Sequence, residues 1–324
     1  MLLFSLRETL FMLMGAIAID WAIGDPKRLP HPVIIIGKWI GFWEKRLLPR
    51  SPKRLYGIAL TLIVVSTGFA VVWGLVAAAS WIHPWLGYAV NTWFISTTIA
   101  VKGLKDAAML VYHCLSRGDL AGARKYTGYI VGRDTEELGE GELSRAAVET
   151  VAENTVDAVI SPLFFALLGG APLAMLYRSA NTLDSMVGYR NAKYALFGWA
   201  SARFDDVLNW VPARLTGALL VLAALLYPKA SAARAWKAVF TFASLHPSPN
   251  SGIPESAVAG GLGVQLGGLN RYGGVASERA RLGWALRKLE KDDILHTIRL
   301  LYVTTYLVMG GLACAAFGWP LWNG

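Results

Sequence analysis

The sequence predicts an all-α, polytopic integral membrane protein, and three observations support this. Only 16% of the 324 residues are charged, whereas soluble domains usually carry about 25%. Residues 55–101, 158–177 and 300–324 form uncharged runs of 47, 20 and 25 residues, and about 20 apolar residues suffice for one helical crossing. No strand-period alternation or β-hairpin signal stands out, so we expect helices throughout.

We expect about 5–8 transmembrane or re-entrant helices in a single integral membrane domain, residues 1–324. His83-Pro84 marks a turn inside the longest uncharged run, while Asp119 and Gly139 mark helix starts in a polar region. The predicted spans lie near 2–24, 55–81, 86–101, 158–177, 207–228 and 300–320, and the polar regions are 24–54, 102–157, 178–206 and 229–299.

Basic residues are concentrated in region 24–54, which holds eight Lys or Arg against two acidic residues. The positive-inside rule therefore predicts that this loop is cytoplasmic. We expect the lipid bilayer as a partner and a multi-pass protein of the cell (inner) membrane. Nucleic acid is not expected, because no basic stripe with interleaved aromatic residues lies in a polar region.

Two apolar segments contain helix breakers. Segment 158–177 holds Pro162 and the run from Gly169 to Pro172, and segment 207–228 holds Pro212 and Arg214. Two simple crossings would place 178–207 on the side opposite the cytoplasm. We favour re-entrant or discontinuous helices, because irregular backbone at membrane depth is tolerated where it lines a polar cavity.

Three carboxylates precede the first broken segment. Glu149, Glu153 and Asp157 recur every four residues, which predicts one shared helical face, with Asn154 beside them. Such a group suits Mg²⁺ held together with substrate phosphates. A solvated acidic stripe is the alternative.

A second polar group follows segment 158–177, and carboxylates, amides and arginines are mixed in it. This mixture also favours a phosphate and Mg²⁺ site. Arg214 either contacts substrate or extends to the membrane interface. The residues of this group are Asn181, Asp184, Ser185, Arg190, Arg203, Asp205, Asp206 and Asn209.

The stretch 246–256 is dense in turn formers and contains His246, Asn250 and Glu255. Such a loop can present backbone N–H groups to an anion, or it can be a linker at the membrane surface. No stretch fits the P-loop or the dinucleotide-binding glycine pattern.

Taken together, the motifs resemble the CobD/CbiB family, the adenosylcobinamide-phosphate synthases of cobalamin biosynthesis. The resemblance covers most of the chain, in the same order, with serine at 251 and 256 where alanine is expected. The matching segments start at Asp20, Gly132, Glu149, Asn181, Ala202 and His246, and a glycine-rich tail runs through Tyr272-Gly273.

The resemblance implies a membrane ligase that uses ATP and Mg²⁺ and faces the cytoplasm. It would join adenosylcobyric acid to 1-aminopropan-2-ol phosphate or ethanolamine phosphate. Candidate general bases are Asp184, His246 and Glu255. Candidate metal ligands are Glu149, Glu153, Asn154, Asp157, Asp205 and Asp206. Candidate substrate and phosphate contacts are Arg133, Asn181, Ser185, Arg190, Arg203, Asn209, Arg214 and Asn250.

Two other functions fit part of the pattern. Broken helices with ionisable residues are also typical of transporters, so a corrinoid-handling transporter is one alternative, although no internal repeat is visible. A membrane phospho-alcohol transferase would also use aspartates with Mg²⁺, but its aspartate motif is absent. Other membrane enzymes of cobalamin assembly and a second copy of this chain are candidate partners.

Overall fold

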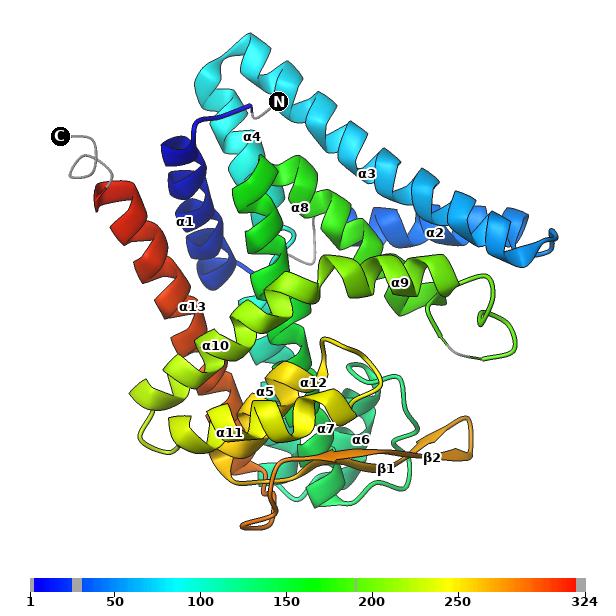
Figure 1. The fold of residues 1–324 in the computed structure, drawn as a ribbon, viewed down its shortest axis with the longest axis vertical. Helices are drawn as coiled ribbons and strands as arrows, with labels where there is room; N and C mark the ends of the chain where they lie inside the picture. The colour runs from blue at the N-terminus through cyan, green and yellow to red at the C-terminus, as the bar shows by residue number, and fades with distance from the viewer. Residues whose placement is uncertain (1–2, 25–30, 190, 319–324) are drawn as a thin grey trace. The chain divides into compact units, whose positions relative to one another are not determined.

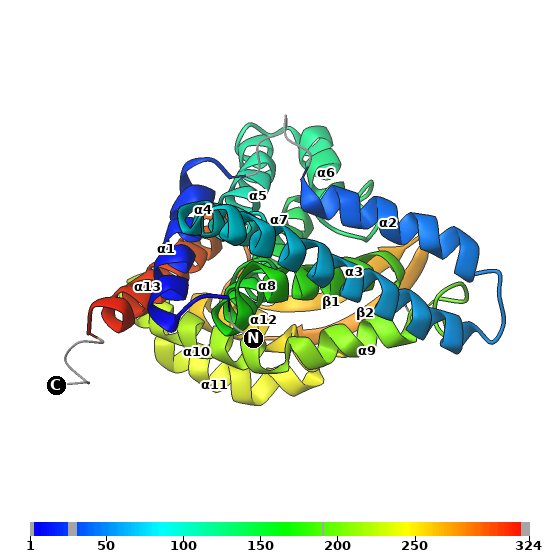
Figure 2. The same ribbon diagram turned by 90° about the horizontal axis from the view of Figure 1, so that it is seen from above.

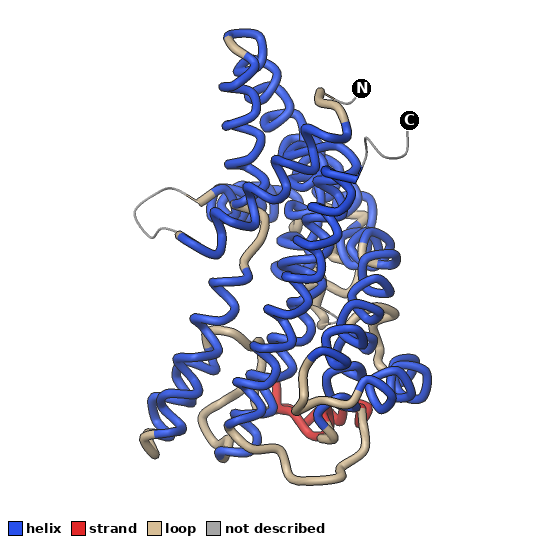
Figure 3. Tube along the Cα trace, turned by 90° about the vertical axis from the view of Figure 1, so that its left-hand side faces the viewer, coloured by secondary structure: helices blue, strands red, loops and turns tan. Residues whose placement is uncertain are grey.

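The computed structural model describes residues 3–24, 31–189 and 191–318. It is mostly helical, at 74% helix, and Figure 3 shows one short hairpin among the helices of this described part. The chain divides into two compact units, residues 1–100, 157–209 and 309–324 in unit 1 and residues 101–156 and 210–308 in unit 2. The expectation of one integral membrane domain stays a prediction.

Unit 1 is built around two long helices, α3 and α8, which pack against each other. Helix α3 also contacts α4, α2 and α9, and Figures 1 and 2 show α2 running beside it. As expected, a turn separates α3 from α4, where the His83 side chain accepts a hydrogen bond from the Trp85 N–H. The elements are α1 (Leu6–Ala22), α2 (Pro32–Leu47), α3 (Lys53–Ile82), α4 (Pro84–Ser96), α8 (Ser161–Val187) and α9 (Trp199–Leu208).

Helix α8 is broken in the middle, as the glycines of segment 158–177 predicted. Gly170 has a φ of +66°, a conformation that only glycine adopts readily. The backbone N–H of Ala171 then donates 2.9 Å to the side-chain oxygen of Asn91, a fully buried residue of α4. An amide from a neighbouring helix thus satisfies the broken backbone, as apolar surroundings require.

Unit 2 encloses the short helix α12, all of whose residues are buried. Helices α11, α10 and α7 and strand β2 pack around it. The expected helix starts are confirmed, because Asp119 caps α6 and Gly139 precedes α7. The elements are α5 (Val101–Ser116), α6 (Leu120–Gly128), α7 (Glu140–Thr155), α10 (Trp210–Leu226), α11 (Ala232–Phe242), α12 (Gly252–Leu262), β1 (Leu266–Tyr272), β2 (Val275–Leu282) and most of α13 (Asp292–Gly318).

The sequence predicted helices throughout and no β-hairpin, and this prediction was wrong at residues 266–282. Strands β1 and β2 pair in antiparallel fashion through a two-residue turn, Gly273-Gly274, in which both φ angles are positive. Glycine pairs favour this type of turn. Few alternating apolar residues flank the turn, so the periodicity that normally reveals a hairpin is weak here.

The three predicted carboxylates do not continue along one α-helical face. Helix α7 ends at Thr155, and a π-helical turn, Val156–Ile160, contains Asp157. A π-helix has a wider repeat than an α-helix, so the four-residue spacing holds for Glu149 and Glu153 only.

Among the residues that the structure describes, three helical segments are long and apolar enough to cross a membrane, Lys53–Ile82, Glu140–Val187 and Asp292–Gly318. A fourth span results if α9 and α10 count as one broken crossing. The helices at the other two predicted spans, α1 and α4, have 17 and 13 residues. The chain is a multi-pass membrane protein.

Candidate functional site

The polar side chains of unit 1 form a buried network centred on Asn209, which ends α9. Its side-chain oxygen accepts hydrogen bonds from the Ser161 hydroxyl at 2.6 Å and the Tyr177 hydroxyl at 2.9 Å. Its amide nitrogen donates 2.9 Å to the Asp205 carboxylate. Asn209 is 2% exposed, and both hydroxyl-bearing residues are fully buried. These three bonds fix the amide and hold α9 against both ends of the apolar segment of α8.

Asp205 brings further members of the predicted group together. Its other carboxylate oxygen accepts 3.4 Å from Asn181, whose own oxygen accepts from Arg178 at 3.5 Å. The Asp184 and Asp206 carboxylates repel the charge of Asp205, which is 8% exposed. Because buried like charges need compensation, this network favours a cationic group beside Arg178.

Gly188 explains how Asp184 fits at the end of α8. A side chain at this position would place its Cβ 1.9 Å from the Asp184 carboxylate oxygen, so only glycine leaves room. Ser185 is exposed, and Arg203 pairs with Asp206 at 3.4 Å on the surface. Arg190 lies outside the described residues.

Unit 2 contains a second cluster, in which Glu149 joins two arginines. Its carboxylate oxygens lie 2.9 Å from Arg133 and 3.1 Å from Arg145, and all three side chains are at most 12% exposed. Asn270 of β1 accepts from both arginines, at 2.6 and 3.0 Å. Both Glu149 oxygens therefore already hold arginine partners, an arrangement typical of a structural ion pair.

A glycine bulge in β1 completes the surroundings of Glu149. The strand register shifts between Leu266 and Gly268, and Gly267 has a φ of +82°. A Cβ there would lie 2.0 Å from the Ala280 carbonyl. A bulged residue is left unpaired in the strand ladder, and the Gly267 N–H donates 2.8 Å to Glu149 instead.

The adjacent residues Arg133 and Asp134 connect the α6–α7 loop to the hairpin. Asp134 accepts hydrogen bonds from the backbone N–H groups of Gly274 and Gly273, at 2.7 and 2.9 Å. Those two bonds lower the pKa of the Asp134 carboxyl. Arg133 points into the cluster while its neighbour holds the hairpin turn.

A polar cavity of about 140 Å³ lies beside this cluster. Arg133, Arg279, Glu153, Asn154 and Glu255 line it, together with Glu149, Thr150, Tyr272 and residues 130–132 and 146. The Ser251 hydroxyl donates 2.9 Å to Glu153, and the Asn154 amide nitrogen donates 2.9 Å to the Thr150 carbonyl. The cavity therefore presents carboxylate, amide and guanidinium groups together.

Glu255 is the most deeply buried acid of the cavity, at 3% exposure. Burial raises its pKa well above the usual range, and the neighbouring Glu153 and Glu149 carboxylates raise it further. The ring of His246 lies 3.8 Å from Glu255, and burial lowers the pKa of this histidine. Both groups are thus biased towards their neutral forms.

The loop that follows His246 is held by its own side chains. His246 accepts from the Ser248 N–H at 3.1 Å, and the Ser248 hydroxyl accepts from the Asn250 N–H at 3.2 Å. Asn250, 5% exposed, also accepts from Arg214 at 3.5 Å, whose guanidinium stacks 4.0 Å from the Trp210 ring. The stacking occupies Arg214, and these contacts orient α12.

The candidate residues therefore fall into two clusters. Asn181, Asp205 and Asn209 are linked in unit 1, and Arg133, Glu149, Glu153, Asn154 and Glu255 in unit 2. Within the described residues, no group of three or more His, Cys, Asp or Glu side chains could hold a metal ion. Mg²⁺ bound through substrate phosphates needs only one or two carboxylates. Sequence reasoning missed Ser161, Tyr177, Arg145, Asn270 and Arg279.

Known proteins resemble the chain over most of its length. The family model described as "CobD/Cbib protein" matches residues 13–301. "Cobalamin biosynthesis protein CobD" of Klebsiella pneumoniae is 48% identical, covering 90% of this chain and 92% of that protein. The protein of the same name from Halalkalibacterium halodurans is 47% identical, covering 89% and 91%. "Cobalamin biosynthesis protein CbiB" of Salmonella typhimurium is 46% identical, covering 93% and 95%. No solved structure matches.

The family match covers both clusters, since residues 13–301 include every clustered side chain of unit 1 and of unit 2. The motifs that carry the resemblance are also the segments that supply the clustered side chains. The chain belongs to the CobD/CbiB family of cobalamin biosynthesis proteins.

Proposed function

We propose that this protein is an ATP-dependent amide ligase. It joins the free propionate carboxyl of adenosylcobyric acid to the amine of 1-aminopropan-2-ol phosphate, or of ethanolamine phosphate, and yields adenosylcobinamide phosphate. Family membership supports a biosynthetic enzyme, and the cavity that gathers Arg133 and Arg279 beside Glu153 and Glu255 carries the finer assignment. We place this chemistry at the cytoplasmic face of the cell membrane.

The charges of the cavity suit a phosphate. Arg133 and Arg279 supply two guanidinium groups, and Glu149 is already neutralised through its pairing with Arg133 and Arg145. Burial and the neighbouring carboxylates raise the pKa of Glu255 and favour its uncharged form, so Glu153 is the acid that faces the arginines with its charge. Guanidinium groups bind phosphate oxygens in a bidentate manner, which would orient the phosphorylated substrate.

The donor set also fits Mg²⁺. Glu153 has a carboxylate oxygen beyond the one that Ser251 contacts. The Asn154 side-chain oxygen remains available when its nitrogen bonds Thr150. Mg²⁺ would neutralise phosphate charge there, with Glu153 and Asn154 as its ligands. In unit 1, Asp205 and the neighbouring Asp184 would pair with a cationic group, although no three acids of the described residues gather closely enough to hold a metal ion.

The reaction activates a carboxylate, which is a poor acyl donor. The propionate oxygen takes the terminal phosphoryl group of ATP, ADP leaves, and the amine nitrogen then attacks the acyl carbon while inorganic phosphate departs. The attacking ammonium must lose a proton. His246 is the preferred acceptor, because burial lowers its pKa and so favours the neutral imidazole, which can take up a proton.

The test is an assay of the full chain purified in detergent. Adenosylcobyric acid, the aminoalcohol phosphate, Mg²⁺ and ATP are supplied, and both the amide product and ADP are measured. Equal amounts of the two are expected. Glu153→Gln and Asp184→Asn should abolish turnover without unfolding the protein. Glu140→Gln, on the exposed start of α7, should leave turnover unchanged. Wild-type protein that forms no amide and leaves ATP intact would disprove the ligase and favour transport.

A further inference from the structure

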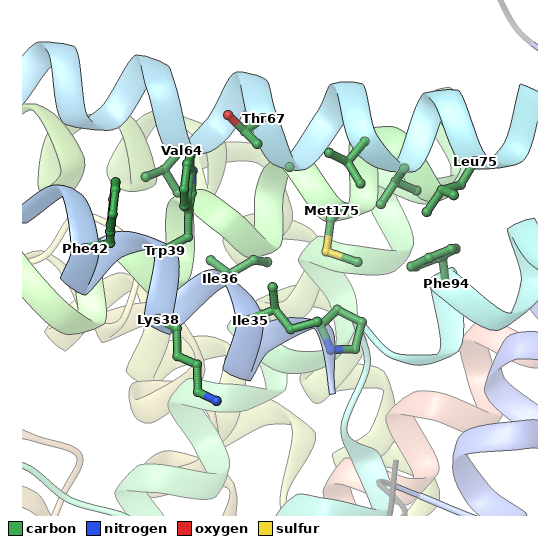
Figure 4. Close-up of a pocket in the computed structure, with 14 residues that line it drawn as sticks. Ile35, Ile36, Lys38, Trp39, Phe42, Val64, Thr67, Leu75, Phe94 and Met175 are labelled. Carbon is green, nitrogen blue, oxygen red and sulfur yellow. The ribbon is translucent and has the colours of Figure 1, made fainter. Parts of the chain in front are cut away.

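Unit 1 contains a large apolar cavity that none of the motifs explains. Helices α2, α3 and α8 line it with Phe94 of α4, and its volume is about 610 Å³, within the range of small-molecule sites. Apart from Thr67 and Lys38 the lining side chains are apolar. Figure 4 shows that the amine of Lys38 points away from α3, so no charge faces the interior.

This cavity opens outward from the spans. Val71 and Leu75 on α3 are 55% and 48% exposed, and Ile35 on α2 is 57% exposed, although all three line the cavity. Helix α3 and the segment containing α8 are both long and apolar enough to cross a membrane. Hydrocarbon therefore surrounds the opening, and an acyl chain is the occupant that this environment supplies.

One end of the cavity carries a fixed positive charge. The Arg46 guanidinium lies 3.4 Å from the ring of Phe42, a lining residue, and donates 3.0 Å to the Phe42 carbonyl. Arg46 is exposed and has no carboxylate partner among the residues that the structure describes. Its remaining donors can bind a phosphate.

The composition of α2 agrees with a position at the membrane surface. Trp39, Phe42 and Trp43 form an aromatic cluster, with ring centroids 5.3 to 5.6 Å apart. Tryptophan is enriched at the interface between hydrocarbon and headgroups. A helix with apolar residues on one side and lysine or arginine on the other is typical of this position.

We propose that this cavity binds one acyl chain of an anionic phospholipid, and that Arg46 binds the phosphate of its headgroup. None of the residues that line this cavity belongs to either polar cluster, and the proposed lipid site does not depend on the proposed ligase activity. A specifically bound lipid would hold α2 against α3 and α8.

The test of the acyl-chain site uses the full chain in detergent and phosphatidylglycerol as the probe, with bound lipids counted by native mass spectrometry. Wild type is expected to retain one lipid after detergent washing. Val71→Trp fills the cavity and should lose it, whereas Leu62→Trp, at a 62% exposed position of the same helix outside the cavity, should not. Equal retention by all three proteins, or equal loss by both variants, would overturn the proposal.

The headgroup assignment is tested separately, with Arg46→Glu against Lys45→Glu as a matched charge control. Arg46→Glu should weaken phosphatidylglycerol binding about fivefold, equivalent to about 1 kcal/mol for one basic side chain, and should remove the preference over phosphatidylcholine. Lys45→Glu should keep that preference. If the two variants behave alike, Arg46 does not bind the phosphate.

Discussion

Glu149 offers the sharpest test of what the cluster in unit 2 does, since a metal ligand and a structural ion pair respond differently to Glu149→Gln. The substitution removes the carboxylate charge and keeps the shape. Arg133 and Arg145 then remain buried, at 6% and 11% side-chain exposure. Removing one partner of a buried pair costs about 3–5 kcal/mol. A glutamine oxygen can still accept one hydrogen bond, so we expect about 3 kcal/mol, the lower end of that range.

This loss should appear in thermal unfolding of the detergent-purified chain. A change of 1 kcal/mol moves the midpoint of a large domain by about 2–4 °C, so a decrease of roughly 6–12 °C is expected. Glu140→Gln is the matched control on α7, because this residue is exposed in the first turn. Its interaction with the helix dipole is worth under about 1 kcal/mol.

The same variant separates structure from metal binding. If Glu149 only positions its two arginines, the Mg²⁺ concentration for half-maximal amide formation should be unchanged in the surviving folded protein. A variant that melts like wild type but needs much more Mg²⁺ would refute the ion-pair assignment. Glu149 would then be a ligand, as the sequence pattern predicted.

Three further changes test other contacts. Because the pKa of Glu255 is raised in the folded state, ionisation of this carboxyl opposes folding as the pH rises above its ordinary value of 4.5. The melting midpoint of Glu255→Gln should therefore rise relative to that of wild type above this pH and show no such rise below it. A pH-independent difference would contradict the raised pKa. Asp134→Ala should speed amide hydrogen exchange at Gly273 while the core of α12 keeps its protection, and unchanged exchange would mean that the turn does not depend on this carboxylate. Asn209→Leu strands two buried hydroxyls and a carboxylate and should lower stability by about 3 kcal/mol or more in thermal unfolding, whereas an unchanged midpoint would show that the network contributes nothing.

The sequence predicted the helical membrane class and the broken helices because both depend on local composition. Uncharged runs give α3 and α13, and a glycine pair gives the break in α8. The positions of single side chains depended on contacts far apart in the chain. In the sequence, Tyr177 is one tyrosine in an apolar segment, and nothing marks it as part of a polar network. Its hydrogen-bond acceptor, Asn209, lies 32 residues later in the chain.

The hairpin was missed for a related reason. Its register depends on a bulge at Gly267 and on the hydrogen bonds that the Asp134 carboxylate accepts from the turn. Asp134 lies about 140 residues earlier in the chain. With the hairpin unseen, Arg145 and Asn270 had no visible role. Glu149 consequently read as a free acid available for a metal, although the folded chain surrounds it with arginines.

Across the described residues, buried polar atoms without a partner are more numerous around the unit 2 cluster than in the unit 1 network, where Arg178 Nε is one such atom. In unit 1 the side chain of Asn209 uses its oxygen and its nitrogen in three hydrogen bonds, which makes the network rigid. In unit 2 the Arg133 Nε, Asn270 Nδ2 and His246 Nε2 atoms are buried without a hydrogen-bond partner within the described part of the chain. A buried polar atom left unsatisfied costs about 1–3 kcal/mol. Such atoms persist where a ligand supplies the missing partners, so the cavity beside them, rather than the Asn209 network, is where we expect the phosphorylated substrate to bind.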